Sequence, residues 1–157
     1  MLLVAGCNGS KATSQPAPKA APHLSYRAVD AQHQRLIHDY EPVSRALTGY
    51  ERAYRDWRLG RLSTAKLSAR ATSFRATVTA AIRRLRAAPA TGPTAGGKQL
   101  FLAALTVRRQ ALLTPPGSAR YREQWDRSAV DARRGLSLLQ NIRERARLIP
   151  LPEDSVS

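Results

Sequence analysis

The sequence predicts an all-α protein, a four-helix up-down-up-down bundle with long first and fourth helices. Three observations predict this fold. Apolar residues recur in alternating steps of three and four along four separate segments, which is the spacing of one buried helix face. Proline and glycine interrupt the chain between these segments. No segment shows sustained alternation of apolar and polar residues, which is the pattern of a half-buried strand.

The first helix is expected to begin at Tyr26 and to end before Gly60, a residue type that commonly ends helices. Pro42 lies inside this segment and removes one backbone hydrogen bond, so the segment should form either one kinked helix or two collinear helices. A polar residue, His33, fills the one gap in the apolar face. That face consists of Val29, Leu36, Tyr40, Val43, Leu47, Tyr50, Tyr54 and Trp57.

The second helix is expected to start at a cap supplied by Ser63 or Thr64 and to end at Pro89. Its apolar face consists of Leu67, Ala71, Phe74, Val78, Ala81 or Ile82, and Leu85. Residues 90–97 hold one proline and three glycines, and we expect them to form a linker.

A shorter third helix is expected from about Lys98 to Thr114, where Pro115 breaks it. Its start, residues 100–105, is apolar nearly all round, which predicts deep burial. The fourth helix is expected to be capped by Ser118 and stopped by Pro150. Its apolar face consists of Tyr121, Trp125, Ala129, Ala132, Leu136, Leu139, Ile142, Ala146 and Ile149.

This topology predicts which residues share a layer. The end of the first helix should lie level with the start of the second, the end of the third and the start of the fourth. That layer should hold Tyr50, Tyr54, Trp57, Leu67, Leu112, Tyr121 and Trp125. Because the first and fourth helices are longer than the third, we expect residues 26–40 and 139–149 to project beyond it as a two-helix extension, partly covered by the second helix.

The N-terminus carries the only cysteine of the chain, Cys7, preceded by Val4, Ala5 and Gly6. These four residues resemble the lipobox of bacterial lipoproteins, in which the cysteine thiol is diacylglycerylated and the chain is cut just before it. The resemblance implies a lipid anchor at Cys7, on the cell membrane or outer membrane and facing outside the cytoplasm. Residues 1–6 are shorter than a signal peptide and contain no basic residue, so we interpret them as the remnant of a truncated one.

The remaining chain divides by composition. Residues 8–24 consist almost entirely of Gly, Ser, Lys, Ala, Thr, Gln and Pro, which cannot bury enough apolar surface to offset the entropy of ordering. We expect residues 7–24 to be a lipidated, disordered tether, 25–150 to form the helical bundle, and 151–157 to be a disordered tail.

Charge is the unusual property of this composition, with 26 basic against 11 acidic residues and a formal net charge of +15. Between Trp57 and Arg122 the chain has basic residues but no acid, so the second and third helices should present a basic face. Such a face attracts anionic lipid head groups or acidic surface polymers. The candidate polyanion-binding residues are Arg70, Arg75, Arg83, Arg84, Arg86, Arg108 and Arg109. The alternative is an ordinary solvated face in an arginine-biased proteome.

No motif for catalysis, a metal or a cofactor was found. One cysteine excludes an internal disulfide and any zinc site built on two or more thiolates. No glutamate is followed three residues later by a histidine, which excludes the di-iron carboxylate bundle. His33 and His38 face different directions, and we expect His33 to be hydrogen-bonded or exposed. The sequence therefore predicts a protein that is not an enzyme and that has no cofactor.

These observations favour a lipid-anchored, extracytoplasmic binding or structural module whose basic face meets an anionic surface. The alternative is a cytoplasmic, nucleic-acid-associated helical protein, which the pI favours and the lack of a compact reader motif disfavours. A third hypothesis is a ligand pocket near Trp57 and Trp125, in which Arg58, Arg61 or Arg122 meets an anionic group.

Overall fold

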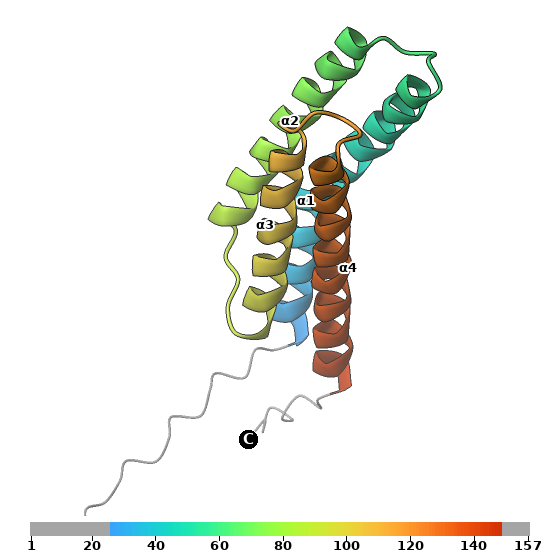
Figure 1. Cartoon of the computed structure of the whole chain (residues 1–157). Coiled ribbons are helices and arrows are strands. Elements are labelled where there is room, and N and C mark those ends of the chain that lie inside the picture. Colours follow the sequence, from blue (N-terminus) through green and yellow to red (C-terminus); the bar gives the residue numbers. More distant parts are fainter. Residues whose placement is uncertain (1–25, 149–157) are drawn as a thin grey trace, which may run out of the picture.

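The structure is a computed structural model that describes residues 26–148, apart from the side chains of Pro93, Ala146 and Leu148. Its helices are α1 (Tyr26–Arg58), α2 (Thr64–Ala87), α3 (Pro93–Ala111) and α4 (Ala119–Leu148), and this part of the chain has no strand. The expected all-α, four-helix architecture is confirmed. Figure 1 shows each helix running back along the one before it. The expected anchor at Cys7, the tether and the C-terminal tail lie outside the described residues.

The longest helix, α1, is continuous through Pro42 and bends, so the first of the two alternatives, one kinked helix, is correct. It ends at Arg58, before Gly60, as expected. Gly60 has a φ of +71°, and its amide donates to the carbonyl of Trp57 while the amide of Arg61 donates to that of Asp56. This pair of bonds is a Schellman motif, which satisfies carbonyls at the helix end and needs a glycine in the left-handed region.

Side-chain caps start α2 and α4 as the sequence predicts. The hydroxyl of Ser63 accepts a hydrogen bond from the amide of Lys66 at 3.3 Å, and that of Ser118 accepts one from the amide of Tyr121 at 3.1 Å. Each hydroxyl satisfies one of the amides that have no partner within the first helical turn. The last residue of α2 is Ala87, two residues before Pro89.

The expected start of the third helix was wrong, because α3 begins at Pro93 rather than Lys98. Proline suits the first position of a helix, since its fixed φ is already helical and its missing N–H has no intrahelical role there. Gly97, expected in a linker, instead lies inside α3 against α4. A Cβ placed on it would be 2.5 Å from Cγ of Leu139, so glycine here permits close approach of the two helices.

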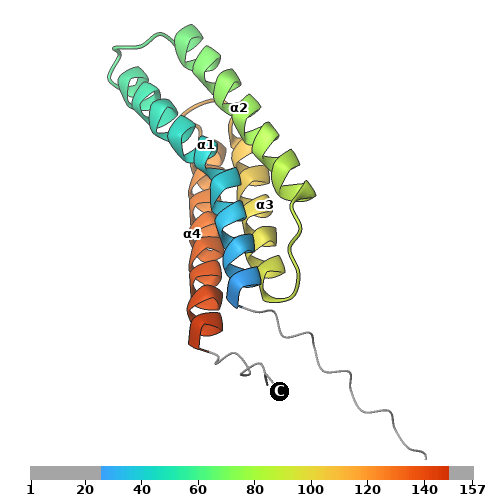
Figure 2. The ribbon, with the colours of Figure 1, turned by 180° about the vertical axis from the view of Figure 1, so that it is seen from behind.

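The expected two-helix extension at residues 26–40 and 139–149 was also wrong. The side chain of Gln32 bonds to Thr91 and to Thr94 at the start of α3, and the ring of Tyr40 lies 5.1 Å from that of Phe101. The first half of α1 is therefore covered by α3, which starts five residues earlier than expected. Figures 1 and 2 show that the opposite end projects instead, where the α1–α2 hairpin rises beyond α3 and α4.

The expected aromatic layer is confirmed and holds one further ring. Tyr50 contacts Trp125 at a centroid distance of 5.4 Å, and Tyr54 contacts Tyr121 at 5.3 Å. The additional ring is Phe74 of α2, which lies 5.5 Å from Tyr50. Burial of these large side chains from three helices stabilises the bundle at this level.

The buried face of α4 differs in part from the expected one. Ser128 and Gly135 are buried, whereas Leu136 is 36% exposed. The reason is close packing on α3, because a Cβ on Gly135 would lie 3.2 Å from Cβ of Leu100 and 3.4 Å from the carbonyl oxygen of Gly97. Small residues occupy positions where large apolar side chains would hold the two helices apart.

Candidate functional site

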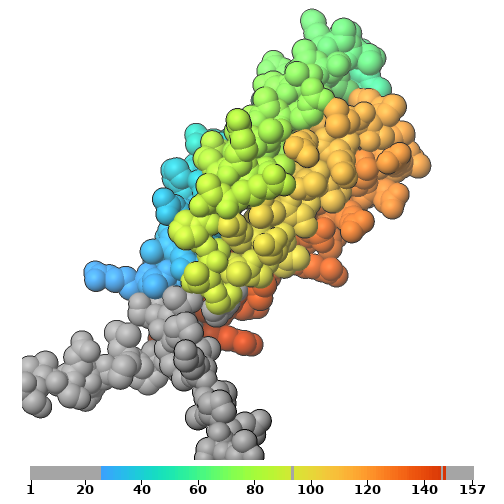
Figure 3. All heavy atoms as spheres, turned by 90° about the vertical axis from the view of Figure 1, so that its left-hand side faces the viewer, coloured from blue at the N-terminus to red at the C-terminus, as the bar shows by residue number. Residues whose placement is uncertain are grey.

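Figure 3 shows that α2 and α3 lie side by side on one face of the molecule. Arg70, Arg83, Arg84 and Arg86 are exposed, while Arg75 of α2 and Arg109 of α3 are partly buried. Neither helix contains an acidic residue. We call these six residues the basic face: Arg70, Arg75, Arg83, Arg84, Arg86 and Arg109.

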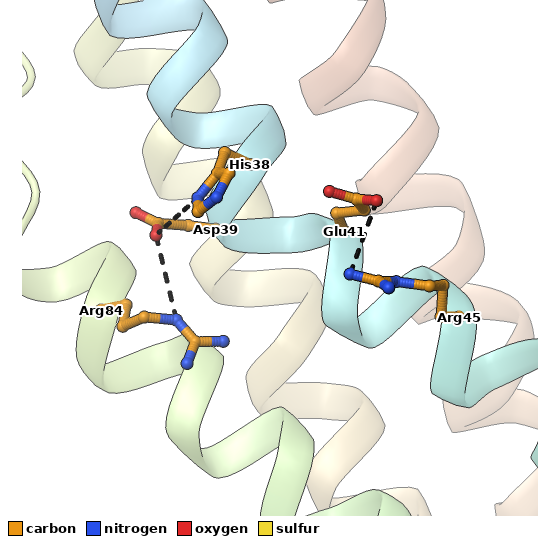
Figure 4. Close-up of polar contacts among 5 residues, drawn as sticks. All are labelled: His38, Asp39, Glu41, Arg45 and Arg84. Carbon is orange, nitrogen blue, oxygen red and sulfur yellow. Dashed lines mark ion pairs between the residues drawn. The ribbon is translucent and has the colours of Figure 1, made fainter.

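One residue of the basic face has an acidic neighbour across the α1–α2 interface. The Nε of Arg84 lies 3.9 Å from a carboxylate oxygen of Asp39 on α1, and His38 also lies beside that carboxylate (Figure 4). Exposed ion pairs of this kind contribute at most about 1 kcal/mol to stability. Arg84 is therefore partly neutralised, whereas Arg70, Arg83 and Arg86 form no ion pair with any described residue.

Part of the basic charge has a structural role. The last turn of each helix carries two arginines, as Arg84 and Arg86 do in α2. Positive side chains at a helix C-terminus interact favourably with the partial negative charge of its free carbonyls. The ammonium of Lys98 acts similarly on α2, because it donates to the carbonyls of Arg86 and Ala88.

Arg108 does not belong to the exposed basic face, and its expected exposure was wrong. Its side chain points into the bundle and leaves the residue only 4% exposed. The Nε donates to the hydroxyl of Ser128 at 3.0 Å, and the guanidinium carbon lies 4.5 Å from the ring centroid of Trp125. The hydroxyl of Ser128 in turn donates to the carbonyl of Trp125. Arg108 therefore joins α3 to α4 from inside the core.

The environment of Arg108 is unusual for a buried charge. Its Nη1 has no hydrogen-bond partner among the described residues, and no carboxylate there lies within 4.0 Å. Burial lowers the pKa of its guanidinium, while Tyr40 and Glu51 act in the opposite direction through their charges. A buried charged group that lacks a partner is costly, and such groups are normally paired.

The burial of Arg108 was detectable in the spacing of the chain. Gly97, Phe101, Ala104, Arg108 and Ala111 follow one another in steps of four, three, four and three, and all five are buried. The prediction for α3 rested on large apolar residues. It therefore missed a buried stripe that consists mostly of small residues and includes Arg108.

The aromatic layer also contains a hydrogen-bonded pair of buried phenols. The hydroxyl of Tyr121 donates to that of Tyr50 at 3.2 Å. Burial raises the pKa of both phenols, so both are neutral at physiological pH. This bond fixes α1 against α4 next to Trp125.

A pocket of about 240 Å³ opens between α1 and α4 beside this layer. Rings of Tyr54, Tyr121 and Trp125 form its wall, and charged side chains surround it. The four charged residues are Glu51, Arg58, Arg122 and Asp126. The sequence had placed such a pocket near Trp57 and Trp125, with Arg58, Arg61 or Arg122. Trp125, Arg58 and Arg122 line this pocket, whereas Trp57 and Arg61 do not. Arg61 is paired with Asp56 at 3.6 Å, and the indole N–H of Trp57 donates to the hydroxyl of Thr64.

His33 was expected to be hydrogen-bonded or exposed, and it is neither. It is 7% exposed, and neither ring nitrogen has a hydrogen-bond partner within the described part of the chain. Burial lowers the pKa of its imidazole, and the charge of Arg143 lowers it further, whereas Asp30 opposes this. Its place in the heptad gap therefore reflects core packing with a neutral ring.

Within residues 26–148, no group of three or more His, Cys, Asp or Glu side chains is placed to hold a metal ion. No helix in this region has the length and apolar character needed to cross a bilayer. No protein-family model matches the chain, and comparisons with curated proteins and with solved structures find no similar protein.

Proposed function

We propose that this chain is a non-catalytic binding or structural module, attached to the outer side of a cell membrane or outer membrane through lipidated Cys7. In this role the basic face binds an anionic partner, namely head groups of acidic lipids or an acidic surface polymer. One observation carries the proposal: Arg70, Arg83 and Arg86 are exposed on an acid-free helix and form no ion pair with any described residue.

The position of Arg83 and Arg86 supports a partner on the membrane side. Arg84 lies level with Asp39, in the first half of α1, so Arg83 and Arg86 are in the half of the molecule where α1 begins. A tether that leads to Tyr26 would hold this half towards the membrane. Basic residues near an anionic leaflet contribute about 1 kcal/mol each to binding.

Vesicle binding tests the proposal on the full chain with Cys7→Ser, which removes acylation as a variable. We expect the protein to bind vesicles of phosphatidylcholine with phosphatidylglycerol at low salt and to dissociate as salt rises, because exposed charges are screened beyond about 8–10 Å at physiological ionic strength. Vesicles of phosphatidylcholine alone should not bind. Reversal of Arg70, Arg83 and Arg86 to glutamate should lower the partition coefficient by about tenfold or more.

A matched control separates the basic face from net charge. Reversal of Arg52, Arg120 and Arg127, all exposed and towards the end of α1 or in the first half of α4, changes the net charge by the same amount. If this control loses as much binding as the α2 variant, with helicity retained in both, the basic face is an ordinary solvated surface and the proposal fails. If the parent prefers double-stranded DNA over vesicles by orders of magnitude and shows a sequence preference, the nucleic-acid alternative replaces it, since charge alone reads no bases.

Acylation is tested separately in cells. A precursor with a complete signal peptide should incorporate an alkynyl fatty acid at Cys7, and the Cys7→Ser variant should not. Equal labelling of the two proteins would remove the anchor from the proposal while leaving the vesicle result unchanged.

A further inference from the structure

The pocket between α1 and α4, which we call the aromatic pocket, has features that the proposed function does not use. Its wall is a series of nearly parallel rings. Tyr54 and Tyr121 are 5.3 Å apart with an interplanar angle of 22°, and Tyr121 and Trp125 are 5.4 Å apart with an angle of 21°. Rings arranged in this way offer a contact surface for another planar group.

The charged residues around the aromatic pocket do not neutralise one another by contact. Glu51, Arg58, Arg122 and Asp126 form no ion pair within 4.0 Å with any described residue. Arg58 and Arg122 come from the end of α1 and the start of α4, so both can meet a group bound between the two helices. An arginine side chain recognises carboxylate or phosphate oxygens through two parallel hydrogen bonds.

Arg108 adds a third positive charge from inside the bundle. It does not line the aromatic pocket, but its guanidinium lies against the ring of Trp125, which does. Its Nη1 has no hydrogen-bond partner in the described chain, and Glu51 is the carboxylate whose charge acts on it. Because Arg108 is buried, its field is screened less by salt than the field of an exposed arginine.

These charges and the size of the pocket select a class of ligand. Two carboxylates stand against three guanidinium groups, which leaves one net positive charge around the pocket. A ligand with a single negative charge complements this net charge. A volume of about 240 Å³ is below the roughly 300–1,000 Å³ typical for drug-sized ligands, so the ligand has one ring or two fused rings.

We infer that the aromatic pocket is a binding site for a small planar organic monoanion, such as an aryl carboxylate. Its ring packs on Tyr54 and Trp125, the partly exposed rings of the wall, and its anionic group faces Arg122 and Arg58. Arg108 is a positioning residue, because its buried charge makes the pocket favour anions without touching the ligand. This inference is independent of the basic face and of the lipid anchor.

Two-dimensional NMR of the full chain with Cys7→Ser tests this inference, because the chain has only two tryptophans. Three probes share an indole ring and differ in the charge of the side chain: indole-3-acetate is an anion, indole-3-acetamide is neutral and tryptamine is a cation. Indole-3-acetate should shift the indole N–H resonance of Trp125 in a saturable manner and move that of Trp57 less. We expect indole-3-acetamide to bind more weakly and tryptamine to bind most weakly.

Two variants on the same turn of α4 provide the matched comparison. Arg120 and Arg122 are both exposed, but only Arg122 lines the aromatic pocket, so neither substitution should disturb folding. Arg122→Ala should weaken binding of indole-3-acetate roughly three- to tenfold, the loss expected for one exposed charge-assisted contact. Arg120→Ala should change the affinity by less than about twofold, because the charge of Arg120 lies outside the pocket and is screened by salt.

A third variant tests the positioning role of Arg108. Arg108→Gln removes the charge and keeps a donor that can reach Ser128. It should lower the affinity for indole-3-acetate and leave that for indole-3-acetamide unchanged, so that the preference for the anion shrinks. The inference is overturned if tryptamine binds more tightly than indole-3-acetate, if none of the three probes shifts Trp125 at millimolar concentration, or if Arg122→Ala and Arg120→Ala behave alike.

Discussion

The two hairpins of the bundle are packed in different ways. In the α1–α2 hairpin the buried positions carry large apolar side chains such as Leu36, Leu67 and Leu85, each at most 1% exposed. In the α3–α4 hairpin several buried positions carry glycine, alanine or serine, and α3 and α4 form the most extensive helix pair of the molecule. These small residues are Gly97, Ala104, Ala111, Ser128 and Gly135.

The difference shows that one bundle can use two opposite devices for helix packing. Large side chains fill the space between helices and contribute by the apolar area they remove from water. Small residues contribute by letting the backbones approach, so that the rest of each helix gains contact. A smaller side chain therefore destabilises the first kind of packing, and a larger side chain destabilises the second.

The largest effect is expected from truncation in the α1–α2 hairpin. Leu85→Ala removes most of a fully buried side chain and leaves a cavity, which should lower the free energy of unfolding by about 2–5 kcal/mol. Chemical denaturation measures this loss. A loss below about 1 kcal/mol would show that this hairpin does not depend on its large side chains.

The opposite change should destabilise the α3–α4 hairpin. Gly97→Ala introduces a Cβ that would lie 2.5 Å from Leu139, and overpacking of this kind lowers the free energy of unfolding by about 1–3 kcal/mol. The matched control is Gly49→Ala in α1, where no atom lies within 4 Å of the new Cβ. It should raise the free energy of unfolding by about 0.5–1 kcal/mol, because alanine favours the helix.

A double-mutant cycle then isolates the close approach. In a Leu139→Ala background the clashing atoms are absent, so Gly97→Ala should behave as Gly49→Ala does. If Gly97→Ala stabilises the unmodified protein, the two helices are not held at the distance the structure shows.

An effect of similar size is expected at the buried polar contact of the α3–α4 hairpin. Ser128→Ala removes the hydroxyl that accepts from Nε of Arg108 and leaves that donor buried without its partner, which should lower the free energy of unfolding by about 1–3 kcal/mol. Arg108→Met removes the charge together with its unpartnered Nη1 and should change stability by less than about 1.5 kcal/mol in either direction. Should Arg108→Met destabilise more than Ser128→Ala, the guanidinium has stabilising contacts beyond those described.

The smallest effect concerns pH and the α1 side of the bundle. Burial lowers the pKa of His33 in the folded state below its ordinary value of 6.5, so the unfolded chain takes up the proton first as pH falls. Stability should therefore be highest above pH 6.5 and decrease as the pH drops towards 5. Urea denaturation at pH 7.5 and at pH 5 measures the difference.

Replacement of each described histidine separates this contribution from that of the carboxylates. His33→Leu should reduce the loss of stability between pH 7.5 and pH 5. His38→Leu is the control for a histidine replaced at the surface, since the His38 side chain is 84% exposed. Equal pH profiles for all three proteins would mean that the His33 ring is charged and accommodated in the fold.

The contrast between the hairpins also explains which helix boundaries could be predicted from the sequence. Apolar spacing located α1 and α2 within a few residues, because their large buried side chains follow the heptad pattern. The start of α3 was placed five residues late, because Gly96 and Gly97 signal a linker unless a close neighbouring helix is known. A glycine can allow a turn or the close approach of another helix. Which of the two applies depends on residues far away in the chain, and the local sequence pattern does not contain that information.

The same limit applied to the site. The basic face and a charged aromatic pocket were both foreseeable from composition and topology, and Arg58, Arg122 and Trp125 do meet in one pocket. The burial of Arg108 was missed because arginine is mostly exposed, so its residue type outweighed its heptad position. Steps of three and four that run through small residues identify such a position when residue type does not.

The ion pair between Asp30 and Arg143 has a consequence for chain connectivity. These two side chains meet at 2.6 Å, so the first turns of α1 and the last turns of α4 lie side by side. The four helices therefore form a closed ring in which α4 packs against α1, and only the loops determine which helix comes first in the chain. A circularly permuted chain, cut at the exposed Gly60 turn and joined between α4 and α1 by a short linker, should keep the helicity and cooperative melting of the parent. Loss of cooperative melting would show that the α1–α2 connection itself holds the ring together.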